Sequence, residues 1–188
     1  MMEKPKLLLH TCCAPCVTVP RMRLQDEYDI YCFFYNPNIH PEQEYLRRLA
    51  ELKRIARQLS IVVIEQPYDV DRWMNLIRGL ESAPERGQRC QICYRMRLEA
   101  TAQFAKQEGI EYFTTTLTIS PHKDATMINR LGEELAGRYG VHFLSENFKK
   151  KDGYKQSLEL SAQFQLYRQD YCGCIFSQRS HQRIITMR

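Results

Sequence analysis

The sequence predicts an α/β protein built on a parallel five-stranded sheet with flanking helices. Five short apolar runs predict the strands, at residues 6–10, 28–35, 61–64, 112–117 and 141–144. Four longer segments carry apolar residues at the helical period, at residues 41–59, 69–80, 93–107 and 124–139. Strands that alternate with helices of this length are typical of βαβ units, which build parallel sheets through right-handed crossovers.

The first strand leads from residue 6 to His10 and into a segment, Thr11 to Cys16, that we predict to be a loop. The second strand stops at a run of turn-forming residues at 36–38. The third strand precedes a helix at 69–80 that carries Trp73 and Leu76 on one side, and a loop containing proline and glycine at 82–88. The polar and aromatic tail from Glu146 is expected to be irregular and to fold over one edge of the sheet.

The helix predicted at residues 41–59 is amphipathic. Its apolar positions recur at the helical period, at Tyr45, Leu49, Leu52, Ala56 and Leu59. The pattern leaves five basic residues mostly on the outer side, at Arg47, Arg48, Lys53, Arg54 and Arg57. This outer side is a candidate surface for nucleic acid.

The composition suits a single catalytic domain over residues 1–188. The net charge of +5 is compatible with a nucleic-acid partner. No apolar run approaches the roughly 18 residues that a membrane span needs, and the charged start of the chain lacks the features of a signal peptide. We therefore expect a cytoplasmic protein with no membrane partner.

Seven of the eight cysteines lie in three clusters: Cys12, Cys13 and Cys16, then Cys90 and Cys93, then Cys172 and Cys174. Clustered cysteines in a cytosolic chain usually bind metal or carry out redox chemistry. Two C-x-x-C spacings with additional thiols indicate metal ligation. Cys32, inside an apolar strand, is expected to be a buried packing residue instead.

Three kinds of centre would use such cysteines. Iron–sulfur or another redox metal is favoured, because seven thiols exceed the four that a structural zinc site requires. Structural zinc and metal-free dithiol chemistry stay open as alternatives. The Cys172-Gly173-Cys174 spacing is too tight for an unstrained disulfide, which indicates a redox-active pair or a chelate for a second metal.

Ligand sites of parallel sheets form at the carboxyl ends of the strands. The first cysteine cluster follows the first predicted strand, and a hydroxyl-rich run, residues 114–124, follows the fourth. Asp124 opens the next helix, where it is expected to act as a cap, or else to supply a proton or complete the coordination of an iron. Residues 149–151 and 167–171 are candidates for contacts to nucleic acid.

The sequence resembles the QueH family of cobalamin-independent epoxyqueuosine reductases from about residue 6 to residue 178. Six long motifs carry the resemblance, at residues 10–16 (HTCCAPC), 35–41 (YNPNIHP), 90–97 (CQICYRMR), 113–124 (FTTTLTISPHKD), 149–154 (KKKDGY) and 167–174 (YRQDYCGC). No departure from the family pattern is found at the cysteines.

The resemblance implies a Rossmann-like fold of the adenine-nucleotide-hydrolase kind. It implies a 4Fe–4S cluster, with Cys12, Cys13, Cys90 and Cys93 at the matching ligand positions. It also implies a redox site at Cys172 and Cys174, with or without a second mononuclear iron. The spacing of the cysteines would by itself have paired Cys13 with Cys16.

The reaction implied is the two-electron deoxygenation of epoxyqueuosine in tRNA to queuosine, the last step of queuosine biosynthesis. The substrate partner would be tRNA carrying epoxyqueuosine in its anticodon loop, and the electron donor is one that the sequence does not identify. Asp124 is the candidate proton donor or additional iron ligand, and Cys16 is the candidate ligand of a second iron.

Two rivals use the same features differently. An iron–sulfur-dependent tRNA-thiolating enzyme would bind ATP through a glycine-rich loop after the first strand, but residues 11–16 contain no glycine. A zinc-binding nucleic-acid module would contain zinc without sulfide.

Overall fold

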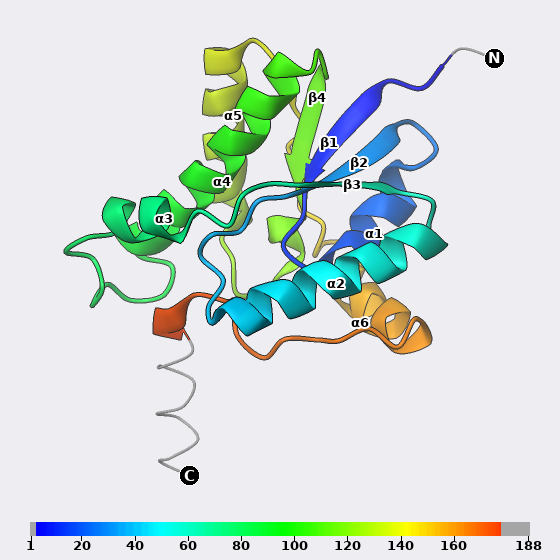
Figure 1. Ribbon diagram of the computed structural model, residues 1–188. Coiled ribbons are helices and arrows are strands. Elements are labelled where there is room, and N and C mark those ends of the chain that lie inside the picture. The colour runs from blue at the N-terminus through cyan, green and yellow to red at the C-terminus, as the bar shows by residue number, and fades with distance from the viewer. Residues whose placement is uncertain (1–2, 178–188) are drawn as a thin grey trace.

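The computed structural model of the protein describes residues 3–177. At its centre lies a five-stranded, all-parallel sheet of order β3-β2-β1-β4-β5 (Figure 1). The strands are β1 (Lys6–His10), β2 (Asp29–Phe34), β3 (Val62–Glu65), β4 (Tyr112–Thr115) and β5 (His142–Phe143). The predicted fold class is confirmed. Residues 178–188, which the predicted single domain includes, lie outside the described residues.

The strand order reverses at β1, which lies in the middle of the sheet. The chain first builds β2 and β3 on one side of β1 and then returns to place β4 and β5 on the other. Leu7 of β1 therefore pairs with Ile30 of β2 and with Tyr112 of β4. The carboxyl ends of β1 and β4 form the switch point at which such sheets bind ligands. The first cysteine cluster follows β1 at this point.

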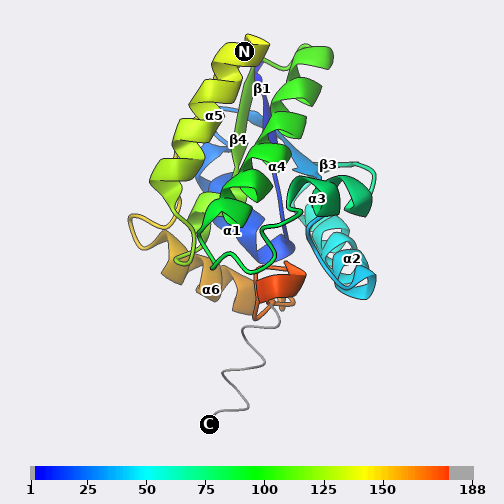
Figure 2. The same ribbon diagram turned by 90° about the vertical axis from the view of Figure 1, so that its left-hand side faces the viewer.

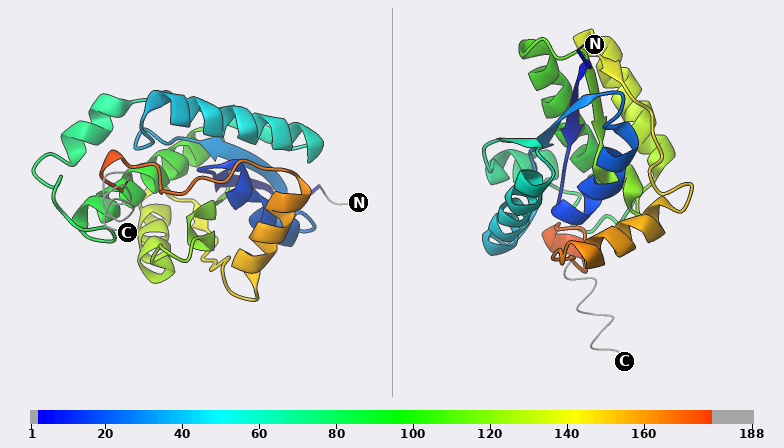
Figure 3. Two further views of the ribbon diagram at one scale, coloured as in Figure 1. Left: turned by 90° about the horizontal axis from the view of Figure 1, so that it is seen from below. Right: turned by 90° about the vertical axis from the view of Figure 1, so that its right-hand side faces the viewer.

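Six α-helices of the described residues, and a 3-10 helix, surround the sheet. They are α1 (Ala14–Leu24), α2 (Glu42–Gln58), α3 (Val70–Leu76), α4 (Gln88–Gln107), η1 (Thr116–Ile119), α5 (Ala125–Tyr139) and α6 (Gly153–Gln163). Figure 2 shows α4 and α5 in front of β1 and β4, and Figure 3 shows α6 beside α1.

The core has two layers because successive residues of a strand point to opposite faces of the sheet. Leu8 packs with buried residues of α4 and α5, among them Leu98 and Leu135. Leu7 and Leu9 pack on the other face, with buried residues of α1 and α2. All three leucines are fully buried.

Helices α1, α4 and α6 differ from the sequence prediction. Helix α1 begins at Ala14, directly after Cys13, where a loop to Cys16 was predicted; Pro15 is compatible with a first helical turn. Helix α4 begins at Gln88, so that both Cys90 and Cys93 lie on it rather than only the second. The tail contains a helix, α6, whose mixed polar and aromatic sequence hides its period.

The fourth strand ends at Thr115, and residues 116–119 form the 3-10 helix η1 instead of continuing the strand. The Thr115 side chain accepts a hydrogen bond from the backbone N–H of Leu117, which turns the chain at the strand end. The turn directs the hydroxyl-rich run back over the cysteines that follow β1. None of the helices within residues 3–177 has the length and apolarity that crossing a membrane requires.

Candidate metal and redox site

The three cysteines after β1 converge. Cys13 Sγ lies 2.8 Å from Cys16 Sγ and 3.8 Å from Cys12 Sγ, and the three sulfur atoms all lie within 4.8 Å of one another. Cys12 and Cys13 precede α1 and Cys16 lies in its first turn, so the start of this helix brings adjacent thiols to one point. Three soft donors at this spacing can hold a metal.

The chemistry of this thiol trio differs from residue to residue. Hydrogen bonds with the thiols of Cys13 and Cys16 lower the pKa of Cys12, whereas burial raises the pKa of Cys13 to about 12. Gln169 donates its side-chain N–H to Cys13 Sγ at 3.1 Å. One sulfur of the trio is thus poised to become a thiolate, the form that binds metals.

A second group of cysteines meets at a small pocket of about 20 Å³. Cys90 and Cys93 reach it from the first turns of α4, and Cys172 and Cys174 reach it from the C-terminal segment. Burial raises the pKa of Cys90 and Cys174, and raises that of Cys93 to about 12. The raised pKa values favour the protonated thiols of Cys90, Cys93 and Cys174 until a metal displaces their protons. We call this the four-thiol pocket.

A larger cavity of about 380 Å³ adjoins the four-thiol pocket. Cys12 and Cys16 of the trio line the cavity, and Cys172 lines both spaces. Two cations, Arg97 and Lys123, also line both. Glu85 lines both spaces as well, so the two thiol groups, from distant parts of the sequence, share a wall with two cations and one carboxylate. The net positive charge of this wall favours anionic occupants.

Arg97 is buried and donates its Nε–H to the backbone oxygen of Cys93 at 3.2 Å. It lies one helical turn after Cys93, so both residues face the same side of α4. Arg97 belongs to the motif at residues 90–97, but no role was predicted for it. The sequence signal for this role is the spacing, which places a basic residue one helical turn after a cysteine of a C-x-x-C pair.

The segment that carries Cys172 and Cys174 is fixed to α2 by Arg48. Its guanidinium forms an ion pair with Glu44 at 2.6 Å and donates to the backbone oxygens of Tyr171 and Cys172, each at 3.2 Å. The prediction that Arg48 lies on the outer, solvent side is wrong. The side chain is buried because the C-terminal segment folds over α2.

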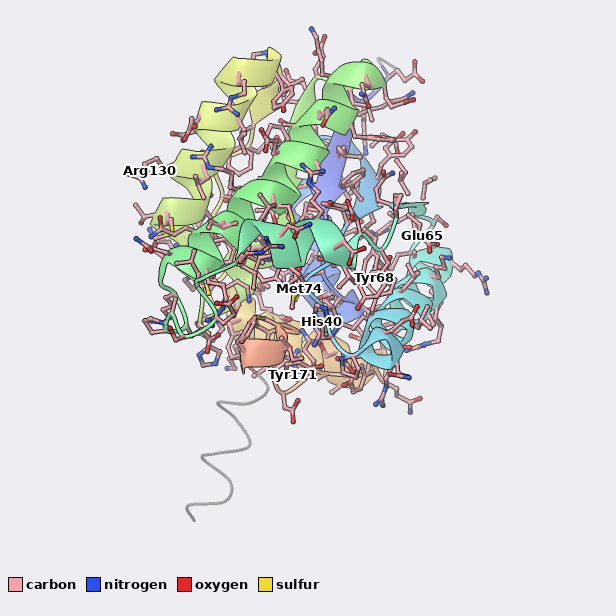
Figure 4. The ribbon with its side chains drawn as sticks, turned by 60° about the vertical axis from the view of Figure 1, so that its left-hand side comes forward. His40, Glu65, Tyr68, Met74, Arg130 and Tyr171 are labelled. Atoms are coloured by element: carbon pink, nitrogen blue, oxygen red, sulfur yellow. The ribbon has the colours of Figure 1, made fainter. Side chains whose placement is uncertain are left out.

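Gly173, between the two cysteines, has a positive φ of 106° and lies against Arg48 and Ile39. A Cβ at this position would lie 3.0 Å from Arg48 and 2.9 Å from Ile39. The backbone oxygen of Gly173 accepts from the N–H of His40 at 2.7 Å, and the Tyr171 hydroxyl donates to the backbone oxygen of His40 (Figure 4). The glycine is therefore required where the two cysteines turn into the pocket.

Three further sequence expectations concern single residues. Asp124 is exposed and accepts the N–H of Met127 at 3.1 Å, which confirms its capping role. Cys32 is fully buried in β2, as expected for a packing residue. The Lys149 ammonium donates hydrogen bonds to the backbone oxygens of Ser120 and Lys123, and so stabilises the loop beside the cavity.

The donor set fits a metal group bound by thiolates. Six thiols border two adjoining spaces, and the seventh, of Cys13, contacts that of Cys16. Two buried N–H groups near them, Nε1 of Trp73 and Nε of Arg89, have no hydrogen-bond acceptor within residues 3–177. Both side chains line the four-thiol pocket. Unpaired donors and soft anionic ligands at the same pocket are complementary to a metal–thiolate group.

The comparisons with known proteins point to one family. A family model described as epoxyqueuosine reductase QueH matches residues 7–180. Epoxyqueuosine reductase QueH of Staphylococcus epidermidis is 41% identical over 183 residues, covering 93% of this chain and 77% of the relative. The protein of the same description from Acinetobacter baylyi is 42% identical over 180 residues, covering 95% of this chain and 83% of the relative.

A crystal structure described as a predicted subunit of tRNA methyltransferase from Methanocaldococcus jannaschii has a similar fold. The TM-score is 0.52 at 14% sequence identity, and the match covers 83% of this chain and 74% of that one. At this identity the likeness concerns the fold alone, which is Rossmann-like and of the adenine-nucleotide-hydrolase kind. The match over residues 7–180 and the identity to the two relatives agree: the chain belongs to the epoxyqueuosine reductase QueH family.

Proposed function

We propose that the chain reduces the epoxide of epoxyqueuosine in tRNA and thereby forms queuosine, the last step of queuosine biosynthesis. Membership of a family whose relatives bear the name epoxyqueuosine reductase supports the reaction. The observation that carries the proposal is the convergence of six thiols on two adjoining spaces, one of which is a cavity of about 380 Å³. Thiols in this number suit a reductive reaction and exceed what a structural site needs.

Cys12, Cys13, Cys90 and Cys93 are the proposed ligands of a 4Fe–4S cluster. In support, Arg97 places its positive charge close enough to Cys12 and Cys93 to favour the thiolate of each. A bound cluster would supply electrons one at a time from a protein-enclosed site. The cationic wall formed by Arg97 and Lys123 would offset part of the negative charge of four thiolate ligands.

Cys172 and Cys174 are the proposed second redox centre. All eight cysteines are free thiols in this structure. Oxidation of the Cys172–Cys174 dithiol to a disulfide releases two electrons and two protons, the number consumed when an epoxide becomes an alkene and water. An external electron donor then returns the disulfide to the dithiol. A second mononuclear iron, with Cys16 as a ligand, is the other form that this centre could take.

The epoxide end of one nucleoside is the group that the cavity would receive. Arg168, Tyr154 and Lys123 line it and offer donors and an aromatic face to a modified base that leaves the anticodon loop. Asp124 retains its proposed second role as proton donor or iron ligand. The tRNA backbone would lie on basic residues outside the cavity, with Lys150 and Lys151 exposed nearby.

The test is anaerobic purification, followed by measurement of iron, sulfide and zinc on the same sample and by an assay with tRNA that carries epoxyqueuosine. We expect iron and sulfide, and queuosine in the digested tRNA when dithionite and a viologen supply electrons. Stoichiometric zinc without sulfide, or reduction by the metal-free protein, would overturn the scheme. Wild-type activity of a Cys16→Ala variant would remove that residue from the mechanism.

A further inference from the structure

The tryptophan of α3 has a buried polar atom without a partner. Trp73 is fully buried, and its Nε1–H has no hydrogen-bond acceptor among the described residues. An N–H that leaves water and finds no acceptor destabilises the folded protein. A phenylalanine would fill most of the same space without this penalty. The acceptor of this N–H is therefore expected to be a group that the polypeptide does not itself contain.

Trp73 lines the four-thiol pocket, together with Cys90, Cys93, Cys172 and Cys174. Thiolate sulfur and inorganic sulfide both accept hydrogen bonds, and metal groups with such ligands are anionic. The indole N–H is a donor only. It is thus matched to a metal–thiolate group and mismatched to an empty or apolar space.

Arg89, which also lines this pocket, has a second buried N–H group without an acceptor among the described residues. Its Nη1 donates to the backbone oxygens of Leu80, Glu81 and Ala83, which fixes the loop before α4. Its Nε has no acceptor among residues 3–177, and the side chain also lines the pocket. Two unpaired N–H groups thus border a single pocket that four thiols also border.

We propose that Trp73 donates its indole N–H to the metal–thiolate group that Cys90 and Cys93 would hold at the four-thiol pocket, and that it raises the reduction potential of that group. A hydrogen bond to a ligand sulfur withdraws charge from the metal and stabilises the reduced, more negative state. The inference rests on the proposed function in one respect, namely that the chain binds a redox metal. Trp73 is then a positioning and tuning residue.

The chain offers an unusually direct probe, because Trp73 is its only tryptophan. Tryptophan fluorescence of the anaerobically purified protein reports this one side chain. A metal–thiolate group in contact with the indole quenches the emission, so we expect emission to rise when a chelator removes the metal. Equal emission with and without metal would overturn the proposal.

The decisive variant is Trp73→Phe, which keeps an aromatic ring and removes the N–H. We expect wild-type iron content and a reduction potential shifted to a more negative value, measured by titration followed through absorbance and electron paramagnetic resonance. Tyr45→Phe is the matched control, because Tyr45 is a buried aromatic that donates to the backbone oxygen of Gln66, away from the thiols. Its potential is expected to equal that of the wild type.

A protein with benzothienylalanine in place of tryptophan replaces the N–H by sulfur at this one position and keeps the shape of the ring. It serves if Trp73→Phe fails to fold, and the same negative shift is expected. If this substituted protein binds iron and its reduction potential is unchanged, the proposed hydrogen bond from Trp73 is refuted, whereas the proposed function is not. A wild-type protein that binds no iron overturns both.

Discussion

Replacement of Arg48 by alanine tests whether the C-terminal segment is held by a buried ion pair. The side chain of Arg48 is 1% exposed and that of its partner Glu44 is 10% exposed. Removal of the guanidinium takes the charged partner from the Glu44 carboxylate, to which the Tyr167 hydroxyl still donates, and leaves two backbone oxygens, of Tyr171 and Cys172, without this donor. Breaking a buried pair on one side typically costs about 3–5 kcal/mol.

We expect Arg48→Ala to lower the free energy of unfolding by about 3–5 kcal/mol. For a chain of this size each kcal/mol corresponds to roughly 2–4 °C, so the unfolding midpoint falls by about 10 °C. The assay is thermal unfolding followed by circular dichroism, in the wild type and the variant at equal metal content. Bound metal would otherwise shift the midpoint by itself.

Arg54→Ala is the matched control. Arg54 lies on the same helix, pairs with Glu51 at 2.7 Å and also donates to two backbone oxygens of the C-terminal segment, of Phe164 and Gln165. It differs in that its side chain is 41% exposed. Exposed pairs contribute about 0–1 kcal/mol, so the control is expected to lose at most that amount. Equal losses in the two variants would refute the reasoning from burial.

Three smaller perturbations have equally definite outcomes. Gly132→Ala places a Cβ 2.4 Å from the ring of Phe143 and is expected to lower the free energy of unfolding by about 1–3 kcal/mol. Gly137→Ala, whose Cβ would have nothing within 4 Å, should stabilise α5 by about 0.5–1 kcal/mol. A higher unfolding midpoint for Gly132→Ala than for Gly137→Ala would contradict the packing. Asp124→Ala should lose about 1 kcal/mol of capping energy while Asp124→Asn retains it, and full epoxide reduction by the Asn variant would exclude a catalytic carboxyl. Cys32→Ala should leave the iron content unchanged, and loss of iron in this variant would show that a cysteine assigned to packing serves the metal site.

The sequence itself was sufficient for the local and the repetitive features. Five apolar runs separated by amphipathic segments determine the parallel sheet, because alternation of such segments leaves few other ways to bury them. The clustering of cysteines indicated metal or redox chemistry. The role of Asp124 as a cap followed from its position before a helical period.

Local sequence was misleading where burial or a neighbour decides the structure. Helix α1 contains Pro20 and is buried on most sides, so it has neither a clear amphipathic period nor a run free of proline. Arg48 lies at a position of α2 that the pattern assigns to solvent. The chain more than a hundred residues later covers it, and no periodicity within α2 can indicate that cover.

Only the tertiary structure grouped the cysteines. Spacing suggested the proximity of Cys13 and Cys16, but it could not indicate that Cys172 and Cys174 meet Cys90 and Cys93 at one pocket. That meeting depends on the path of the C-terminal segment along α2, which the contacts of Arg48 fix. The sequence likewise does not indicate that Trp73 lies at this pocket, because it shows only one apolar residue on a short helix. The sequence determined which thiols exist and which fold carries them, because those follow from local composition and period. Their grouping was decided by contacts between segments far apart in the chain.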